Sequence, residues 1–156
     1  MQSDIQKALN CLAEGKTILY PTDTIWGIGC DATDESAVGK IFRIKQRPQE
    51  KSLIILVDSV EMLKRYVLLS AETASLISSF ELPTTVIYSN PEGLARNAVN
   101  SDNTIAIRIV NHKFCRKLIQ LFGNPIISTS ANISGDKNPV SFEDISEKIK
   151  SEVDFI

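Results

Sequence analysis

The chain has 156 residues, of which 43% are hydrophobic and 23% are charged, and its formal net charge is −2. This length fits one domain with a proper core, and the composition excludes a disordered chain and a coiled coil. An isoelectric point near 5.5 argues against a surface that coats nucleic acid, because such binding depends on many phosphate contacts. The N-terminus lacks the apolar core of a signal peptide, and no apolar run has the length of a membrane span. We therefore expect a cytoplasmic protein with no membrane partner.

Apolar periodicity predicts helices and strands that alternate along the whole chain. The expected elements are a helix over 4–14, strands over 17–20 and 25–29, a helix from a cap at Thr33 or Asp34 to about Gln46, a strand over 52–57, helices over 60–66 and 71–79, strands over 85–88 and 104–110, a helix over 114–122, a strand over 126–128 and a helix over 142–150. We find no internal repeat, linker or low-complexity tract. This order predicts a single α/β domain over 1–156, with a sheet covered by helices.

A cluster of cations stands out in this slightly acidic chain. Five cations fall within twelve positions, namely Lys40, Arg43, Lys45, Arg47 and Lys51. Pro48 restricts its own φ and biases Arg47 toward an extended backbone, so that the cations leave the helix end in a defined shape. A guanidinium and an ammonium can then share a polyphosphate. The alternative is a solvated helix end whose cations complement the helix dipole.

Other motifs are better explained by structure than by chemistry. Gly15-Lys16-Thr17 is similar to the end of a phosphate-binding loop, but Asn10 replaces the earlier glycine and the tripeptide follows a helix. The chain has no G-x-S-x-G elbow, so a serine nucleophile is not expected and the single histidine, His112, is assigned a structural or solvated role. No spacing suggests a metal site. We expect buried, reduced thiols at the cysteines, which are Cys11, Cys30 and Cys115.

The segment Ser128-Thr129-Ser130-Ala131-Asn132 places hydroxyls and an amide at the end of an apolar strand. Ligands meet open α/β sheets at the ends of such strands. A capping turn that satisfies backbone groups locally explains the same residues. Spacing alone leaves both interpretations open.

Four segments together resemble a known family. They are Tyr20-Pro21-Thr22-Asp23-Thr24 with Gly27 and Gly29, Lys45-x-Arg47-Pro48 with Lys51-Ser52-Leu53, Thr104-x-Ala106-x-Arg108, and Ser128-Thr129-Ser130-Ala131-Asn132 with Ser134-Gly135. In this order and spacing, over about residues 5–150, the chain resembles the YrdC family, the L-threonylcarbamoyladenylate synthases. The resemblance implies a YrdC-like α/β domain with a twisted mixed sheet, flanking helices and a positively charged concave face.

The resemblance also implies a reaction and its partners. ATP, L-threonine and bicarbonate or CO2 would give threonylcarbamoyl-AMP and pyrophosphate, for threonylcarbamoylation of adenosine 37 in tRNA. Mg2+ would accompany ATP, bound largely through the nucleotide and water. A downstream tRNA threonylcarbamoyl transferase and a transient tRNA contact follow as partners. A noncatalytic YrdC-like protein that binds nucleotide or RNA is the alternative.

Site residues are carried over from the resemblance by position. The catalytic pair would be Lys45 and Arg47, and the residues facing ATP would be Lys45, Arg47, Lys51, Thr104, Ser130 and Asn138. L-Threonine would be held by Thr24, Arg108 and Ser128. Chemistry supports this division, since a guanidinium can bind a carboxylate with its fork and hydroxyls suit an amino acid's polar groups. Isoleucines alternate with Arg108 on its strand, so we expect its side chain to emerge opposite them and to meet Thr24.

Two features depart from the family pattern. Relatives commonly carry a Pro-Gly-Pro-like turn where this chain reads Leu82-Pro83-Thr84-Thr85, so we expect a loop of different shape. Many relatives also continue beyond the position of Ile156 with a segment that adds nucleotide contacts. We therefore expect either a compact YrdC-like domain without this segment or a domain whose additional nucleotide contacts come from elsewhere.

Overall fold

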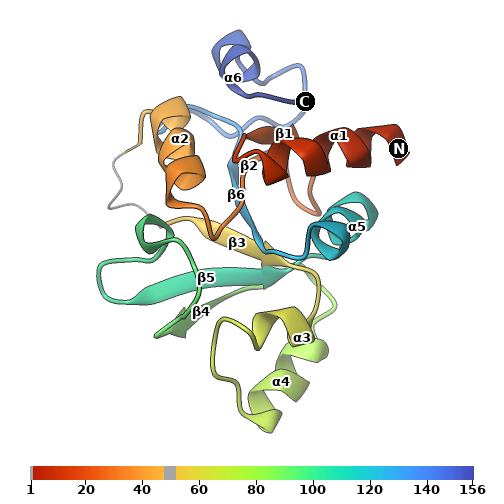
Figure 1. Cartoon of the computed structure of the whole chain (residues 1–156), viewed down its shortest axis with the longest axis vertical. Helices are drawn as coiled ribbons and strands as arrows, with labels where there is room; N and C mark the ends of the chain where they lie inside the picture. Colours follow the sequence, from red (N-terminus) through yellow and green to blue (C-terminus); the bar gives the residue numbers. More distant parts are fainter. Residues whose placement is uncertain (1, 48–51) are drawn as a thin grey trace.

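One twisted sheet organises the molecule, with its strands in the order β1-β2-β6-β3-β5-β4 (Figure 1). The computed structural model describes residues 2–47 and 52–156. The strands are β1 (Ile18–Tyr20), β2 (Gly27–Gly29), β3 (Ile54–Val57), β4 (Thr85–Ser89), β5 (Thr104–Ile109) and β6 (Ile126–Ser130). The pair β3 and β5 is parallel, whereas the other neighbours are antiparallel. The predicted mixed sheet is confirmed, and the positive charge of a concave face stays a prediction.

Helices flank this sheet. They are α1 (Gln2–Ala13), α2 (Glu35–Lys45), α3 (Val60–Leu63), α4 (Ala71–Ser78), α5 (Lys113–Phe122) and α6 (Glu147–Glu152), with a 3-10 turn η1 (Arg96–Ala98). α1 and α5 pack side by side, and α3 and α4 lie together at the β4 side of the sheet (Figure 1). In the described part of the chain, no helix is long and apolar enough to cross a membrane.

Local signals explain where several helices begin and end. The side chain of Asp34 accepts hydrogen bonds from Ser36 N and Ala37 N, which caps α2. Gln46 ends that helix in the left-handed region, at φ 50°. Gly15, at φ 66°, follows α1, so the Gly-Lys-Thr tripeptide is a helix end, as expected.

The last helix is shorter than the sequence predicted. We expected it over 142–150, but α6 begins only at Glu147. The carboxylate of Asp144 accepts from the backbone N–H groups of Val140 and Ser141, and so forms a turn ahead of the helix. Ser146 then caps α6 through Ile149 N. These local bonds compete with helix hydrogen bonds, which apolar periodicity alone does not register.

The two faces of the sheet differ in burial. Ile55, Ile107 and Ile127 share one face and are at most 2% exposed. On the other face, Ile54 is half-buried and Ile87 of the edge strand is 70% exposed. Paired residues of neighbouring strands point to the same side. The face that carries Ile54 is therefore the one on which the sheet can meet a ligand.

Two of the three cysteines are buried, as expected, and Cys11 is half-buried. Burial raises the pKa of the Cys30 thiol and raises that of Cys115 to about 12. Cys115 donates to the carbonyl of Pro21 at 3.1 Å, and its sulfur lies 3.5 Å from Nδ1 of His112, which precedes α5. A structural role explains this group, which matches the expectation for His112.

Candidate active site

A cavity of about 290 Å³ opens beside the half-buried Ile54. Its walls come from the turn before β2, the end of α2, the strands β5 and β6, and the loop after β6. The predicted site residues that line it are Thr24, Arg47, Arg108, Ser128, Ser130 and Asn138. A larger groove, of about 1110 Å³, lies between α1 and α5 and contains none of them. The fold thus places in one cavity six predicted site residues that are up to 114 positions apart in the sequence. Their roles stay predictions.

Arg108 and Thr24 meet in this cavity. Arg108 is 7% exposed, and its Nη2 lies 3.5 Å from Oγ1 of Thr24. The side chain points away from the buried face of Ile107, as strand alternation predicted. Within the described residues, Arg108 Nε is shielded from solvent and has no hydrogen-bond partner. A buried donor without an acceptor is costly, so this atom marks a place where a ligand oxygen fits.

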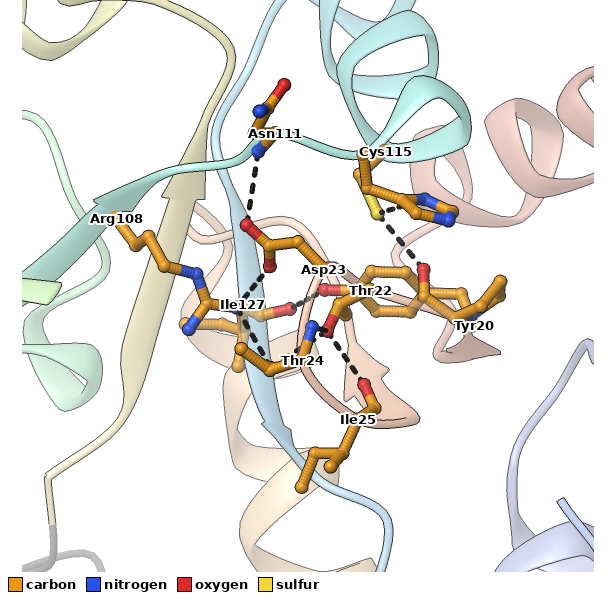
Figure 2. A network of polar contacts seen from close by, with 11 residues as sticks. Tyr20, Thr22, Asp23, Thr24, Ile25, Arg108, Asn111, Cys115 and Ile127 are labelled. Carbon is orange, nitrogen blue, oxygen red and sulfur yellow. Dashed lines mark hydrogen bonds and ion pairs between the residues drawn. The ribbon is translucent and has the colours of Figure 1, made fainter. Parts of the chain in front are cut away.

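Asp23 is a site residue to which sequence reasoning gave no role. Its Oδ1 lies 2.9 Å from Arg108 Nη2, with the two side chains 5% and 8% exposed. Its Oδ2 accepts from Asn111 N at 3.1 Å. Figure 2 shows this carboxylate between Arg108 and Asn111. One signal in the sequence could have identified this role: Asp23 directly precedes Thr24, which was predicted to meet the cation Arg108.

The turn before β2 is held by its own hydroxyls (Figure 2). Thr22 Oγ1 donates to the carbonyl of Ile25 at 2.7 Å and accepts from Thr24 N at 3.1 Å. A close backbone approach lies behind the turn, since a Cβ at Gly29 would fall 2.4 Å from the carbonyl oxygen of Ile127. Glycine there lets β2 lie against β6, which brings Thr24 to the cavity.

Arg47 lies at another part of the cavity wall. Its Nη2 donates to the carbonyl of Ser52 at 2.6 Å. Its Nε is shielded and, among the described residues, without a hydrogen-bond partner. Burial lowers the pKa of this guanidinium. No carboxylate of the described chain forms an ion pair with it.

Lys45 does not line the cavity, although we expected it to face ATP. Its side chain is buried, and Nζ donates to the carbonyls of Ser130 and Asn132 at 2.5 and 2.8 Å and contacts Asn132 Oδ1 at 3.3 Å. An ammonium has three donors, so these oxygens at the end of β6 account for all of them. Burial, and secondarily Arg47, lowers the pKa of Lys45 to about 8. Lys45 thus binds the backbone of Ser130, a residue that lines the cavity, and its contact with ATP stays a prediction.

Thr104, which was also predicted to face ATP, does not line this cavity. Thr104 lies four positions before Arg108 on β5, about 13 Å away at the rise of a strand. Its hydroxyl donates to Asp102 Oδ1 at 2.6 Å. Both side chains project from the same face, so contact with a long ligand stays a prediction. Lys51 and Pro48 lie outside the described residues.

Trp26 also lines the cavity, and sequence reasoning did not single it out. Its ring packs on Phe142, with centroids 5.0 Å apart. Lys150 Nζ lies 4.7 Å from the centroid of the Phe142 ring. The stack links the cavity to α6 and, because the chain has one tryptophan, makes indole fluorescence a probe of this cavity.

Comparisons with known proteins agree with this fold and cavity. The Sua5/YciO/YrdC profile, described as "Telomere recombination", matches residues 10–156. The chain is 35% identical to a threonylcarbamoyl-AMP synthase of Pseudoalteromonas translucida, over 99% of this chain and 84% of the relative. It belongs to the Sua5/YciO/YrdC family.

Further similarities within the family fit this membership. An Escherichia coli threonylcarbamoyl-AMP synthase is 35% identical over 86% of this chain and 74% of its own length. A crystal structure of P. abyssi Sua5 complexed with L-threonine superposes with a TM-score of 0.91, at 32% identity over 99% of this chain. The chain spans 46% of that Sua5 chain, which is about half of its length.

Proposed function

We propose that this protein is a threonylcarbamoyl-AMP synthase, which uses ATP, L-threonine and bicarbonate or CO2 in tRNA modification. One observation carries the proposal. Arg47 and Arg108 line the same cavity, and within the described residues each has a shielded Nε without a hydrogen-bond partner. A carboxylate and a phosphate are the groups that guanidinium forks bind best. The names of the relatives agree with a ligand pair that carries both groups.

In this reaction, the chain aligns reactants and supplies charge. The amine of threonine captures CO2 as a carbamate, and a carbamate oxygen attacks the α-phosphate of ATP and expels pyrophosphate. Arg108 binds the threonine carboxylate, with hydroxyls from Thr24 and Ser128 nearby, and Arg47 binds phosphate. No protein nucleophile is needed. Alignment and electrostatic stabilisation can together account for several kcal/mol of the barrier.

The proposed ATP site includes residues besides Arg47. The cavity is at the lower end of ligand pockets, which span roughly 300–1,000 Å³, so part of ATP lies outside it. Ser130 and Asn138 line the cavity as well, and we assign them to ATP. Lys45 acts through Ser130 and Asn132, whose carbonyls it binds. Lys51 and Thr104 complete the proposed ATP contacts.

Mg2+, the tRNA transferase and the cytoplasmic location belong to the same proposal. The described residues contain no group of three or more His, Cys, Asp or Glu arranged for a metal ion. We propose that ATP phosphates and water hold Mg2+, because this ion keeps several of its waters. Mg2+ would neutralise phosphate charge. The adenylate product is reactive, so a downstream tRNA transferase, with a transient tRNA contact, is the proposed consumer.

Pyrophosphate release is the test. We expect the purified protein to release pyrophosphate from ATP and Mg2+ only when threonine and bicarbonate are both present, and mass spectrometry to detect threonylcarbamoyl-AMP. Omission of each substrate in turn is the control. ATP binding without the adenylate, at saturating threonine and bicarbonate, would instead identify a noncatalytic nucleotide-binding member of the family.

A further inference from the structure

Asp23 is an acid beside the proposed carboxylate site, and its side chain is largely shielded from solvent. Its side chain is 5% exposed. One oxygen accepts from Asn111 N at 3.1 Å, in the loop after β5, and the other lies 2.9 Å from Arg108 Nη2 (Figure 2). Asp23 therefore joins the turn before β2 to Arg108 of β5 and to the backbone of the loop that follows this strand.

The contact between Asp23 and Arg108 is an ion pair that is not aligned as a hydrogen bond. The two atoms are 2.9 Å apart, yet Asp23 Oδ1 has no hydrogen bond of acceptable geometry within the described residues. Arg108 Nη2 is directed instead at Thr24, at 3.5 Å, and Nε has no partner there. The carboxylate thus compensates the buried charge while most of the guanidinium's directed bonds stay free for a ligand.

A ligand carboxylate at Arg108 would share one guanidinium with Asp23. Two anions on one cation repel each other, so Asp23 weakens the affinity of the site for a carboxylate. In return, it holds the guanidinium in one direction, and a misplacement of about 1 Å in a reacting group can cost roughly a hundredfold in rate. The geometry points to Asp23 as a positioning residue that orients Arg108, and through it threonine, at the expense of threonine affinity. This role rests on the proposed function.

Asp23→Asn separates orientation from binding. The amide can still accept from Asn111 N but lacks the charge that holds Arg108. We expect kcat to fall about ten- to a hundredfold, while the threonine dissociation constant stays within threefold of wild type or tightens, and the KM for ATP stays within twofold. Threonine binding is measured by calorimetry without ATP, and turnover by pyrophosphate release.

Asp31→Asn is the matched control. Asp31 is a half-buried acid that accepts from Thr33 N at 2.8 Å and from Asn124 Nδ2 at 3.2 Å, but the described ion-pair partner of Arg108 is Asp23 and not Asp31. This variant should lose stability without a change in kcat beyond twofold.

Asp23→Glu keeps the charge and moves it by one methylene group, and it replaces Asp23→Asn in the test if Asp23→Asn does not fold. We expect the same direction of change with a smaller fall in kcat.

Each outcome decides the question. An unchanged kcat in Asp23→Asn, a rise in the threonine dissociation constant that accounts for the loss, or equal losses for both substrates overturns the positioning role and leaves the proposed function standing. A wild-type protein that binds no threonine overturns both. If the wild type binds threonine but forms no adenylate, the synthase function fails, and a threonine affinity that drops more than threefold in Asp23→Asn overturns the role of Asp23.

Discussion

The cavity has two arginines in different electrostatic settings. Arg108 projects from a strand inside the sheet, is 7% exposed, and has a carboxylate 2.9 Å away. Arg47 follows the left-handed end of α2, is half-buried, and donates to a backbone carbonyl at 2.6 Å. Lys45, close to it in the chain, is also bound by carbonyl oxygens. The Arg108 end is thus buried and charge-compensated, whereas among the described residues the Arg47 end has two cations and no carboxylate ion-paired with either.

This difference separates two kinds of recognition. A buried, charge-compensated guanidinium suits a singly charged carboxylate, which it can bind through two parallel hydrogen bonds. Excess positive charge with fewer constraints suits a polyphosphate, because the gain comes from charge as well as geometry. We therefore expect substitutions at the Arg108 end to affect stability and threonine, and those at the Arg47 end to affect ATP.

Arg108→Ala should have the largest effect. It leaves Asp23 buried without its cation, and breaking a buried pair typically costs about 3–5 kcal/mol of stability. Denaturant unfolding should show this loss, and kinetics of the folded fraction should show a larger increase in the threonine requirement than in the ATP requirement. Equal losses for both substrates would remove the distinction between the two ends.

Two variants serve as controls for that change. Asp23→Ala combined with Arg108→Ala removes both charges, and should recover part of the lost stability. Arg108→Lys keeps a cation near Asp23 and should be more stable than Arg108→Ala. It should still impair threonine use, because an ammonium cannot reproduce the bidentate fork.

Arg47→Ala should weaken ATP binding by about 2 kcal/mol, the scale of a lost hydrogen bond to a charged group. Its effect on stability should be small, because no buried acid loses a partner. Calorimetry measures the ATP affinity, and threonine affinity should stay within twofold. Arg43→Ala is the matched control, since Arg43 is a cation on α2 four positions before Arg47, is exposed, and does not line this cavity. Unchanged ATP affinity in folded Arg47→Ala protein would exclude Arg47 from the site.

The sequence predicted features that depend on local rules. The cap at Asp34 and the helix end at Gly123 follow from side-chain and backbone preferences of a few adjacent residues. The direction of Arg108 follows from strand alternation, which holds wherever a strand forms. Its convergence with Thr24, 84 positions away, came from the family resemblance rather than from any local rule.

The features that sequence reasoning missed depend on distant partners. A contact between Lys45 and ATP stays a prediction, but sequence reasoning did not find its carbonyl partners, which lie 85 and 87 positions later. Asp23 likewise meets Arg108 only because β2 lies on one side of β6 and β3 and β5 lie on the other. Neither composition nor periodicity reports which oxygen atoms a buried cation will find. The residue type therefore indicates which chemistry a side chain can perform, whereas the atoms that it contacts depend on the fold.

Protonation of Lys45 gives the smallest effect. Its pKa is lowered to about 8, first by burial and then by Arg47, so the ammonium is mostly charged below pH 8 and mostly neutral above it. Phosphates bound at Arg47 would favour the charged form and raise this pKa again. ATP binding should then take up protons near pH 8, and ATP affinity should fall as pH rises through 8, by less than about tenfold per pH unit.

Calorimetry in two buffers of different ionisation enthalpy measures this proton uptake. A Lys45→Met variant is the control, since its ATP affinity should not change between pH 7.5 and 9 through this group, whatever its overall affinity. The sign is decisive, because a group that is neutral in the free protein and charged in the complex can only take up a proton. Proton release near pH 8, or uptake that persists in Lys45→Met, would show that bound phosphates do not raise the pKa of Lys45. The positive charge that binds ATP at this end of the cavity would then come from Arg47 and not from Lys45.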